Sequence, residues 1–142
     1  MVLLLLSFPL ASVYICFPLA KCLHIDTRDV FFQGNAFELM TDGLYILEEG
    51  VALVNEPHYN QKWIHGCGGS QVLNEMMATD AVVVNADVVG ASNKLIFLEF
   101  LRALKSALSH LKCNDQGIFN ILAYRQLPPK MSVHILNMTR DS

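Results

Sequence analysis

The chain of 142 residues carries 10 lysines and arginines against 13 aspartates and glutamates, a formal net charge of −3. Its basic residues form no cluster, which excludes the electrostatic footprint expected of a nucleic-acid-binding protein. Hydrophobic residues make up 53% of the chain, enough for one compact core, and the length argues against two full domains.

The first segment, residues 2–20, contains no charged residue. It approaches the roughly 20 apolar residues that a membrane-spanning helix needs. Pro9, Pro18 and the lack of a preceding Lys or Arg are unusual for an anchor or a cleaved signal sequence. Two interpretations stay open: a signal or anchor segment, with the protein then secreted or associated with the ER or Golgi membrane, and a buried strand-and-loop segment or misassigned start. We therefore divide the chain at residue 21 into a hydrophobic segment, 1–21, and a folded region, 22–142.

In the folded region, residues 22–25 form a mainly apolar run that stops at Asp26, which predicts a buried strand ending in a polar turn. In open α/β sheets ligands bind outside the carboxyl ends of strands, so Asp26 is expected where a ligand can reach it. A second strand is predicted over residues 43–49, between turn residues. Residues 57–69 read as a loop or short helix, and Ser70 is expected to start a helix that ends near Met77.

Three consecutive valines make residues 81–85 the clearest strand, of the kind covered on both faces. A helix capped by Ser92 or Asn93 follows, and its apolar residues recur at steps of four and three; the predicted core positions are Phe97, Leu101, Leu104, Leu108 and Leu111. A shorter helix starts at Asn114 or Asp115 and ends before Pro128, and residues 132–136 form a last strand. Strands interleaved with helices predict an α/β fold.

Asp26 and Asp29 stand three positions apart after the first of these strands. Mg²⁺ or Mn²⁺ bridging a diphosphate takes one or two protein carboxylates and completes its shell with phosphate oxygens and water. Arg28 between them can pair with phosphate or with the aspartates. On spacing alone, a turn whose carboxylates cap backbone amides is the more common cause of such a pattern.

The four cysteines, Cys16, Cys22, Cys67 and Cys113, form no Cys-x-x-Cys pair, so their spacing does not support a structural zinc site. Free thiols are the default. In an oxidising compartment three pairings are open, and one of them joins Cys67 to Cys113.

Three segments resemble the nucleotide-diphospho-sugar transferase superfamily, the GT-A-type glycosyltransferases. Residues 23–37 (LHIDTRDVFFQGNAF) are similar to its strand, aspartate motif and following Phe-Gln segment. Residues 84–90 (VNADVVG) resemble its Asn-Ala-Gly strand and turn, and residues 114–120 (NDQGIFN) its Asp-Gln segment. The resemblance implies a partial GT-A (Rossmann-like) fold, a mixed sheet flanked by helices, truncated at both ends because the family's nucleotide-binding βαβ region lies upstream of the aspartate motif.

The resemblance also implies a role for each matching residue. Asp26 and Asp29 would contact Mn²⁺ or Mg²⁺ and the donor diphosphate, with Arg28 near the phosphates. Asn85 and Asp87 would line the sugar, and Asp115 with Gln116 would lie at the reaction centre. Asp87 departs from the pattern, since the family usually has Gly there, and Asp115 also suits a helix N-terminus.

The implied reaction is transfer of a hexose from a nucleoside diphosphate sugar to a hydroxyl acceptor on a glycan or protein, with metal-assisted departure of the diphosphate. The alternative is a non-catalytic remnant, or an incomplete gene model, that keeps the aspartates without a donor pocket. The sequence leaves open whether this chain is an enzyme.

Overall fold

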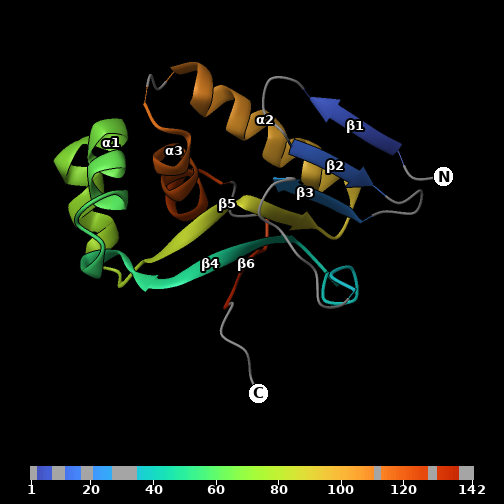
Figure 1. Ribbon diagram of the computed structural model, residues 1–142, viewed down its shortest axis with the longest axis horizontal. Coiled ribbons are helices and arrows are strands. Elements are labelled where there is room, and N and C mark those ends of the chain that lie inside the picture. The colour runs from blue at the N-terminus through green and yellow to red at the C-terminus, as the bar shows by residue number, and fades with distance from the viewer. Residues whose placement is uncertain are drawn as a thin grey trace.

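A computed structural model describes residues 3–7, 12–16, 21–26, 35–110, 113–127 and 131–137. Its strands form one six-stranded sheet in the order β1-β2-β3-β5-β4-β6 (Figure 1). The strand bounds are β1 Leu3–Ser7, β2 Ser12–Cys16, β3 Cys22–Asp26, β4 Leu44–Ala52, β5 Val82–Ala91 and β6 Val133–Leu136. Only β4 and β6 pair in parallel, and the other neighbours are antiparallel. The predicted α/β architecture, a mixed sheet flanked by helices, is confirmed.

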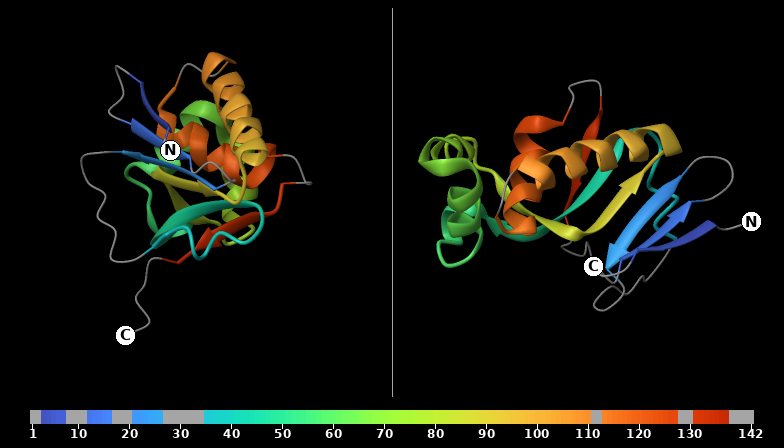
Figure 2. Two further views of the ribbon diagram at one scale, coloured as in Figure 1. Left: turned by 90° about the vertical axis from the view of Figure 1, so that its right-hand side faces the viewer. Right: turned by 90° about the horizontal axis from the view of Figure 1, so that it is seen from above.

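The helices are α1 Asn60–Met77, α2 Lys94–His110 and α3 Asp115–Ile121, with a short helical turn, η1 Leu53–Asn55, before α1 and a second, η2 Leu122–Gln126, after α3. α2 and α3 lie over one face of the sheet, and α1 lies at the end where β5 begins (Figures 1 and 2). The core between sheet and helices contains Leu44, Ile46, Val84, Val89 and Ala91 from the strands and Phe97, Phe100 and Phe119 from the helices.

Alternation along the strands gives the sheet a second apolar face. On β4, Leu44 and Ile46 point to the helices, while Tyr45 lies on the opposite face with Leu23 of β3. Met40, from the segment between β3 and β4, packs there. That packing needs Gly90, because a Cβ at this position would lie 2.2 Å from the Met40 methyl group.

Most predicted elements are confirmed with shifted ends. The strands expected at 22–25, 43–49 and 132–136 are β3, β4 and β6, and Asn114 caps α3 by accepting a hydrogen bond from the Gly117 amide at 3.3 Å. Residues 57–69 supply a short helix rather than a loop: α1 is two helical pieces separated at Gly69, whose φ of 75° is left-handed. Glycine suits that kink because it has no Cβ.

The face of α2 that packs against the core differs in part from the apolar stripe predicted from the sequence. Phe97 is buried as predicted, and Leu101 and Leu104 are partly buried. Leu108, predicted to face the core, is 44% exposed, and Phe100 and Ala107 are buried instead. The stripes through 97, 101, 104 and 108 and through 97, 100, 104 and 107 are both apolar, so helical periodicity alone cannot choose between them. Leu111 lies outside the described residues.

The N-terminal segment contributes two strands to the sheet. β1 pairs with β2, and β2 pairs with β3. The described backbone of this segment is therefore extended, as in the strand-and-loop interpretation of the sequence. Within the residues described, no helix combines the length and the apolar character that crossing a membrane requires.

Candidate functional site

β5 bulges away from its ladder with β4 at the Asn-Ala-Asp sequence. Its register with β4 pairs Ile46 with Val89 and then Glu48 with Val84, so Leu47 alone stands opposite residues 85–88. Extra residues in one strand leave the ladder and bend the chain locally. Here they place Asn85, Ala86 and Asp87 beside the start of α3, where the Asn85 side chain accepts a 2.7 Å hydrogen bond from the Asp87 amide.

Three side chains from α3 and η2, spaced four residues apart, hold the first half of β5. Gln116 accepts a hydrogen bond from the Ala86 amide at 3.1 Å and donates to the Val84 carbonyl at 2.6 Å. Asn120 accepts from the Val84 amide at 3.0 Å and donates to its carbonyl at 3.2 Å. Tyr124 makes the same pair of bonds with Val82, at 3.1 and 2.8 Å; the three residues share one helix face.

This side-chain ladder takes the place of a neighbouring strand. In the described register β3 pairs with β5 only at residues 88–91. Backbone N–H and C=O groups of residues 82, 84 and 86 therefore need other partners, because burying them unpaired is costly. The amide of Gln116 is thus engaged with the strand as well as lining the cavity described below, which makes it a positioning group.

We expect Asn120→Ala to lower the free energy of unfolding by about 1–3 kcal/mol. The side chain is fully buried, and its loss leaves the Val84 amide without its partner and removes one of the two donors to the Val84 carbonyl, the other being Gln116. Urea denaturation measures the change, with Asn74→Ala on the exposed side of α1 as the matched control. A loss for Asn120→Ala no larger than for the control would show that the ladder does not hold β5.

A cavity of about 460 Å³ opens where the bulge meets the starts of α1 and α3. Its acidic side chains are Glu49 at the end of β4, Glu56 before α1, Asp87 on the bulge and Asp115 on α3. Of the described residues that line it, none is Lys, Arg or His. The cavity therefore has a negative potential.

Two residues at the start of α1 form one wall. A carboxylate oxygen of Glu56 accepts hydrogen bonds from the backbone amides of Asn60, at 2.7 Å, and Tyr59, at 3.2 Å. The Asn60 amide group donates to the same oxygen at 3.4 Å, but its own Oδ1 is buried without a hydrogen-bond partner. Asn60 is only 5% exposed, and an unpaired buried acceptor costs about 1–3 kcal/mol.

Tyr59 and Trp63 add an aromatic surface to this wall. Their ring centroids lie 5.6 Å apart, and Tyr59 is 61% exposed. Trp63 reaches the cavity because α1 packs closely on α3 at Gly117. A Cβ there would lie 2.8 Å from the Trp63 carbonyl carbon and oxygen, so only glycine permits this approach.

Glu49 is the cavity carboxylate whose pKa is raised. Burial of its carboxyl group raises the pKa of Glu49 above the usual glutamate value, hydrogen bonding to Asn85 lowers it in part, and the negative charges of Asp87 and Glu56 raise it further. One Glu49 oxygen accepts from Asn85 at 3.5 Å and from Gln116 at 3.3 Å. Glu49 therefore holds a proton to higher pH than a glutamate without these neighbours does.

The structure brings together most of the site residues predicted from the sequence that it describes. Asp87, Asp115 and Gln116 line the cavity, and Asn85 lies next to it on Glu49. Asp87, at the family's usual Gly position, adds a carboxylate. Asp26 ends β3, and extending the Ile25–Val88 pair by one residue places its backbone opposite Asp87.

Two parts of the expected metal site are not described. Arg28 and Asp29 lie outside the described residues, and for Asp26 only the backbone is described. In the part of the chain that the structure describes, no three His, Cys, Asp or Glu side chains converge to hold a metal ion. β3 is antiparallel to both neighbours, so Asp26 meets the middle of β5 rather than the carboxyl ends of parallel strands, which corrects the placement expected from the sequence.

Sequence reasoning missed the wall contributed by α1. Residues 57–69 read as a polar stretch with Trp63 as its only large anchor, and nothing in their spacing indicated that Glu56, Tyr59 and Asn60 would join a site. The signal lies in the fold: Glu56 caps α1, and Gly117 brings the helix against α3.

A disulfide fixes the two helices at this place. Cys67 of α1 is bonded to Cys113, which directly precedes the cap residue of α3, and the Cα atoms are 5.5 Å apart. This is one of the pairings that the sequence left open. Cys22 is also disulfide-bonded, so no described cysteine is free.

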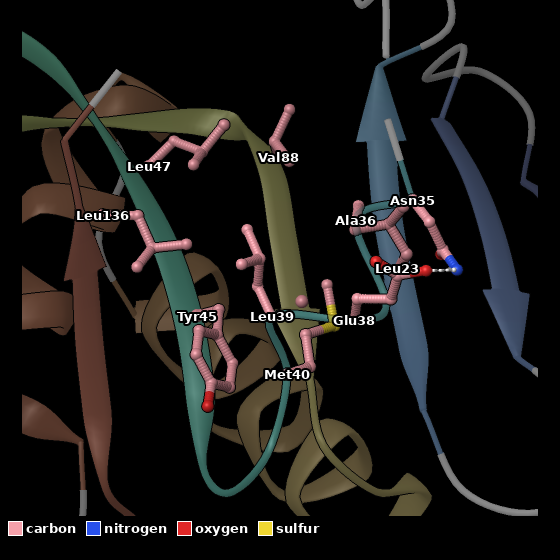
Figure 3. A pocket seen from close by; sticks show the side chains of 11 residues that line it. Leu23, Asn35, Ala36, Glu38, Leu39, Met40, Tyr45, Leu47, Val88 and Leu136 are labelled. Atoms are coloured by element: carbon pink, nitrogen blue, oxygen red, sulfur yellow. Dashed lines mark hydrogen bonds between the residues drawn. The ribbon is translucent and has the colours of Figure 1, made fainter. Parts of the chain in front are cut away.

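A second cavity, of about 380 Å³, lies on the sheet face opposite the helices (Figure 3). Leu47, Val88 and Leu136 of three strands line it with Leu39 and Met40. Its polar residues, Asn35 and Glu38, hydrogen-bond to each other at 3.0 Å (Figure 3). Glu38 is the only carboxylate among its described lining residues, and most of the remaining lining is apolar, so this cavity gathers fewer polar groups than the first.

The chain matches no protein-family model, and comparisons with curated proteins and with solved structures found no match.

Proposed function

We propose that the chain is the core of a metal-assisted glycosyltransferase of GT-A type that transfers a hexose from a nucleoside diphosphate sugar to a hydroxyl acceptor. The observation that supports this proposal is convergence. The bulge of β5 and the start of α3, which carry two of the segments that resemble the family, line one cavity, and the end of β3, which carries the third, runs beside the bulge. These parts of the chain are far apart in the sequence and come near one another only in the tertiary structure. They are Asp26, residues 85–87 and residues 114–116.

In this proposal the two ends of the site have different tasks. Asp26 and Asp29 would hold Mn²⁺ or Mg²⁺, for which carboxylates are suitable donors, and Arg28 would contact phosphate. The metal supplies charge neutralisation for the departing diphosphate. At the cavity, Asp115 would accept a proton from the acceptor hydroxyl, as a general base does at hydrogen-bond distance.

We also propose that the protein works in the secretory pathway or outside the cell. Disulfides persist in oxidising compartments, and the described cysteines are bonded.

The test is metal-dependent binding of nucleoside diphosphates, measured by calorimetry with and without Mn²⁺. We expect binding only with the metal and its loss in Asp29→Asn, since asparagine keeps the turn propensity but removes the charge that the metal requires. Asp80→Asn is the matched control: this exposed residue has a φ of 51°, which asparagine tolerates.

Two results would contradict the proposal: equal affinity of wild type and Asp29→Asn for nucleoside diphosphate, or binding that does not depend on Mn²⁺. An assay of sugar transfer then distinguishes an active glycosyltransferase from a non-catalytic remnant. Release of nucleoside diphosphate from a panel of donor sugars should require an acceptor and disappear in Asp115→Asn.

A further inference from the structure

We propose that the outer face of α2 docks on the surface of an anionic phospholipid bilayer. α2 runs along the outside of the molecule, over one face of the sheet (Figure 2). Its outer face is the arc bounded by Leu108 and Leu95, about 140° wide at 3.6 residues per turn. This arc contains only leucine, lysine, arginine and Ser109. The docking is independent of the proposed reaction, because α2 contributes no described residue to the acidic cavity.

Basic residues that are scattered in the sequence gather on this face. Lys94, Arg102 and Lys105 are all exposed, and none of their side chains forms an ion pair or hydrogen bond with a described residue. Glu99, the only acidic residue of α2, lies outside the arc. The face is therefore positive on a chain whose formal net charge is −3, and it complements a negatively charged surface.

Exposed leucines accompany these basic residues. Leu95 is 77% exposed and Leu108 is 44% exposed, while the opposite side of the helix fills the core with Phe97 and Phe100. Lysine and arginine can lay their aliphatic stems along apolar surface and keep their charged ends at the level of lipid phosphates. Leucines together with basic residues on one helix face are typical of helices that lie in a membrane interface.

The position of Lys94 adds a second indication of an anionic partner. Lys94 is the first residue of α2, and the first turn of the helix contains no acidic residue. The helix dipole disfavours a cation at this end, so folding alone does not favour lysine here. A lipid phosphate near the start of α2 would interact favourably both with the Lys94 ammonium group and with the helix dipole.

A bilayer matches this face better than a protein partner does. Lysine is depleted from the centres of protein interfaces, which are continuous and closely packed. On α2, by contrast, the basic residues stand between the two exposed leucines, Leu95 and Leu108. Neither cavity described above reaches this arc, so neither provides a socket for a partner's side chain. Headgroups that move laterally can adapt to such a mixed face.

Sedimentation of the full chain with vesicles tests the proposal. One set of vesicles is phosphatidylcholine alone, and the other contains about 30% phosphatidylserine, which supplies the negative surface charge. We expect binding to the anionic vesicles to be at least about tenfold tighter in low salt. This difference should disappear at about 0.5 M salt, where charges near a surface are screened.

Variants assign the binding to α2. Lys105→Gln should weaken binding to the anionic vesicles by about fivefold, the effect of one basic residue at such a surface. Lys62→Gln, an exposed lysine on α1, is the matched control and should have little effect. Leu95→Ser should weaken binding by about tenfold, because it removes an apolar side chain from the interface. Its control is Leu39→Ser, which is 66% exposed away from α2. Circular dichroism confirms that each variant is folded.

Three results would overturn the inference. Equal binding to neutral and anionic vesicles, as the uncharged residues 2–20 would produce, would show that α2 is not the contact. Equal losses in Lys105→Gln and Lys62→Gln would assign the effect to total charge, and a chain that binds neither vesicle would leave the face to a soluble partner. None of these results alters metal-dependent binding of nucleoside diphosphate, so the proposed function is tested separately.

Discussion

Replacing Phe100 with alanine is expected to lower the free energy of unfolding by about 3–5 kcal/mol, because the change removes a large buried side chain and leaves a cavity. Phe100 is 1% exposed at the centre of the core between α2, α3 and the sheet. Its ring meets Phe119 edge-on, with centroids 5.9 Å apart at 79°, and lies 6.4 Å from Phe97. The loss therefore also loosens α3, which carries the side-chain ladder.

Urea denaturation of wild type, Phe100→Ala and Leu95→Ala measures this effect. Leu95 lies on the same helix but is 77% exposed, so its replacement should change stability by no more than about 0.5 kcal/mol. Total stabilities of small domains are about 5–15 kcal/mol, so Phe100→Ala alone should shift the midpoint strongly. Similar midpoints for the two variants would show that α2 presents a different face to the sheet.

Removal of the Cys67–Cys113 disulfide, by replacing both cysteines with serine, should cost about 2–4 kcal/mol. The bond closes a loop with a sequence separation of 46, and its loss returns conformational freedom to the unfolded chain. The native state loses a constraint at the same time, because Cys113 precedes the cap residue of α3. We expect the cavity, with Asp115 and Gln116, to become less ordered.

Melting curves with and without reductant test this expectation. Cys22 is disulfide-bonded as well, so reductant acts on more than one bond in the wild type, and the double variant isolates the Cys67–Cys113 bond. Trp63 fluorescence adds a local reading, because it lies beside the constrained start of α3. A double variant as stable as wild type, with unchanged fluorescence, would show that the bond constrains neither state.

Local patterns predict most of the elements, because their causes lie within a few neighbouring residues. Three valines favour extended backbone, Asn114 caps a helix with its own side chain, and a polar residue after an apolar run ends β3. The same reasoning gives the strands 43–49 and 132–136. Resemblance to a family pattern, rather than spacing, groups Asp87, Asp115 and Gln116, and the structure shows that all three line one cavity.

The sequence alone determined which residues are apolar enough to form strands and helices, and which short motifs carry carboxylates. Only the tertiary structure decided which stripe of α2 faces the core, where β5 leaves its ladder, and that Glu56, Asn60 and Trp63 share a cavity with Asp87 and Asp115. The reason is physical. The face that a helix buries, and the point at which a strand bulges, depend on what packs against them. Phe119 of α3 packs against Phe100 of α2, and polar side chains of α3 hydrogen-bond to β5. The β5 partners in particular lie far away along the chain.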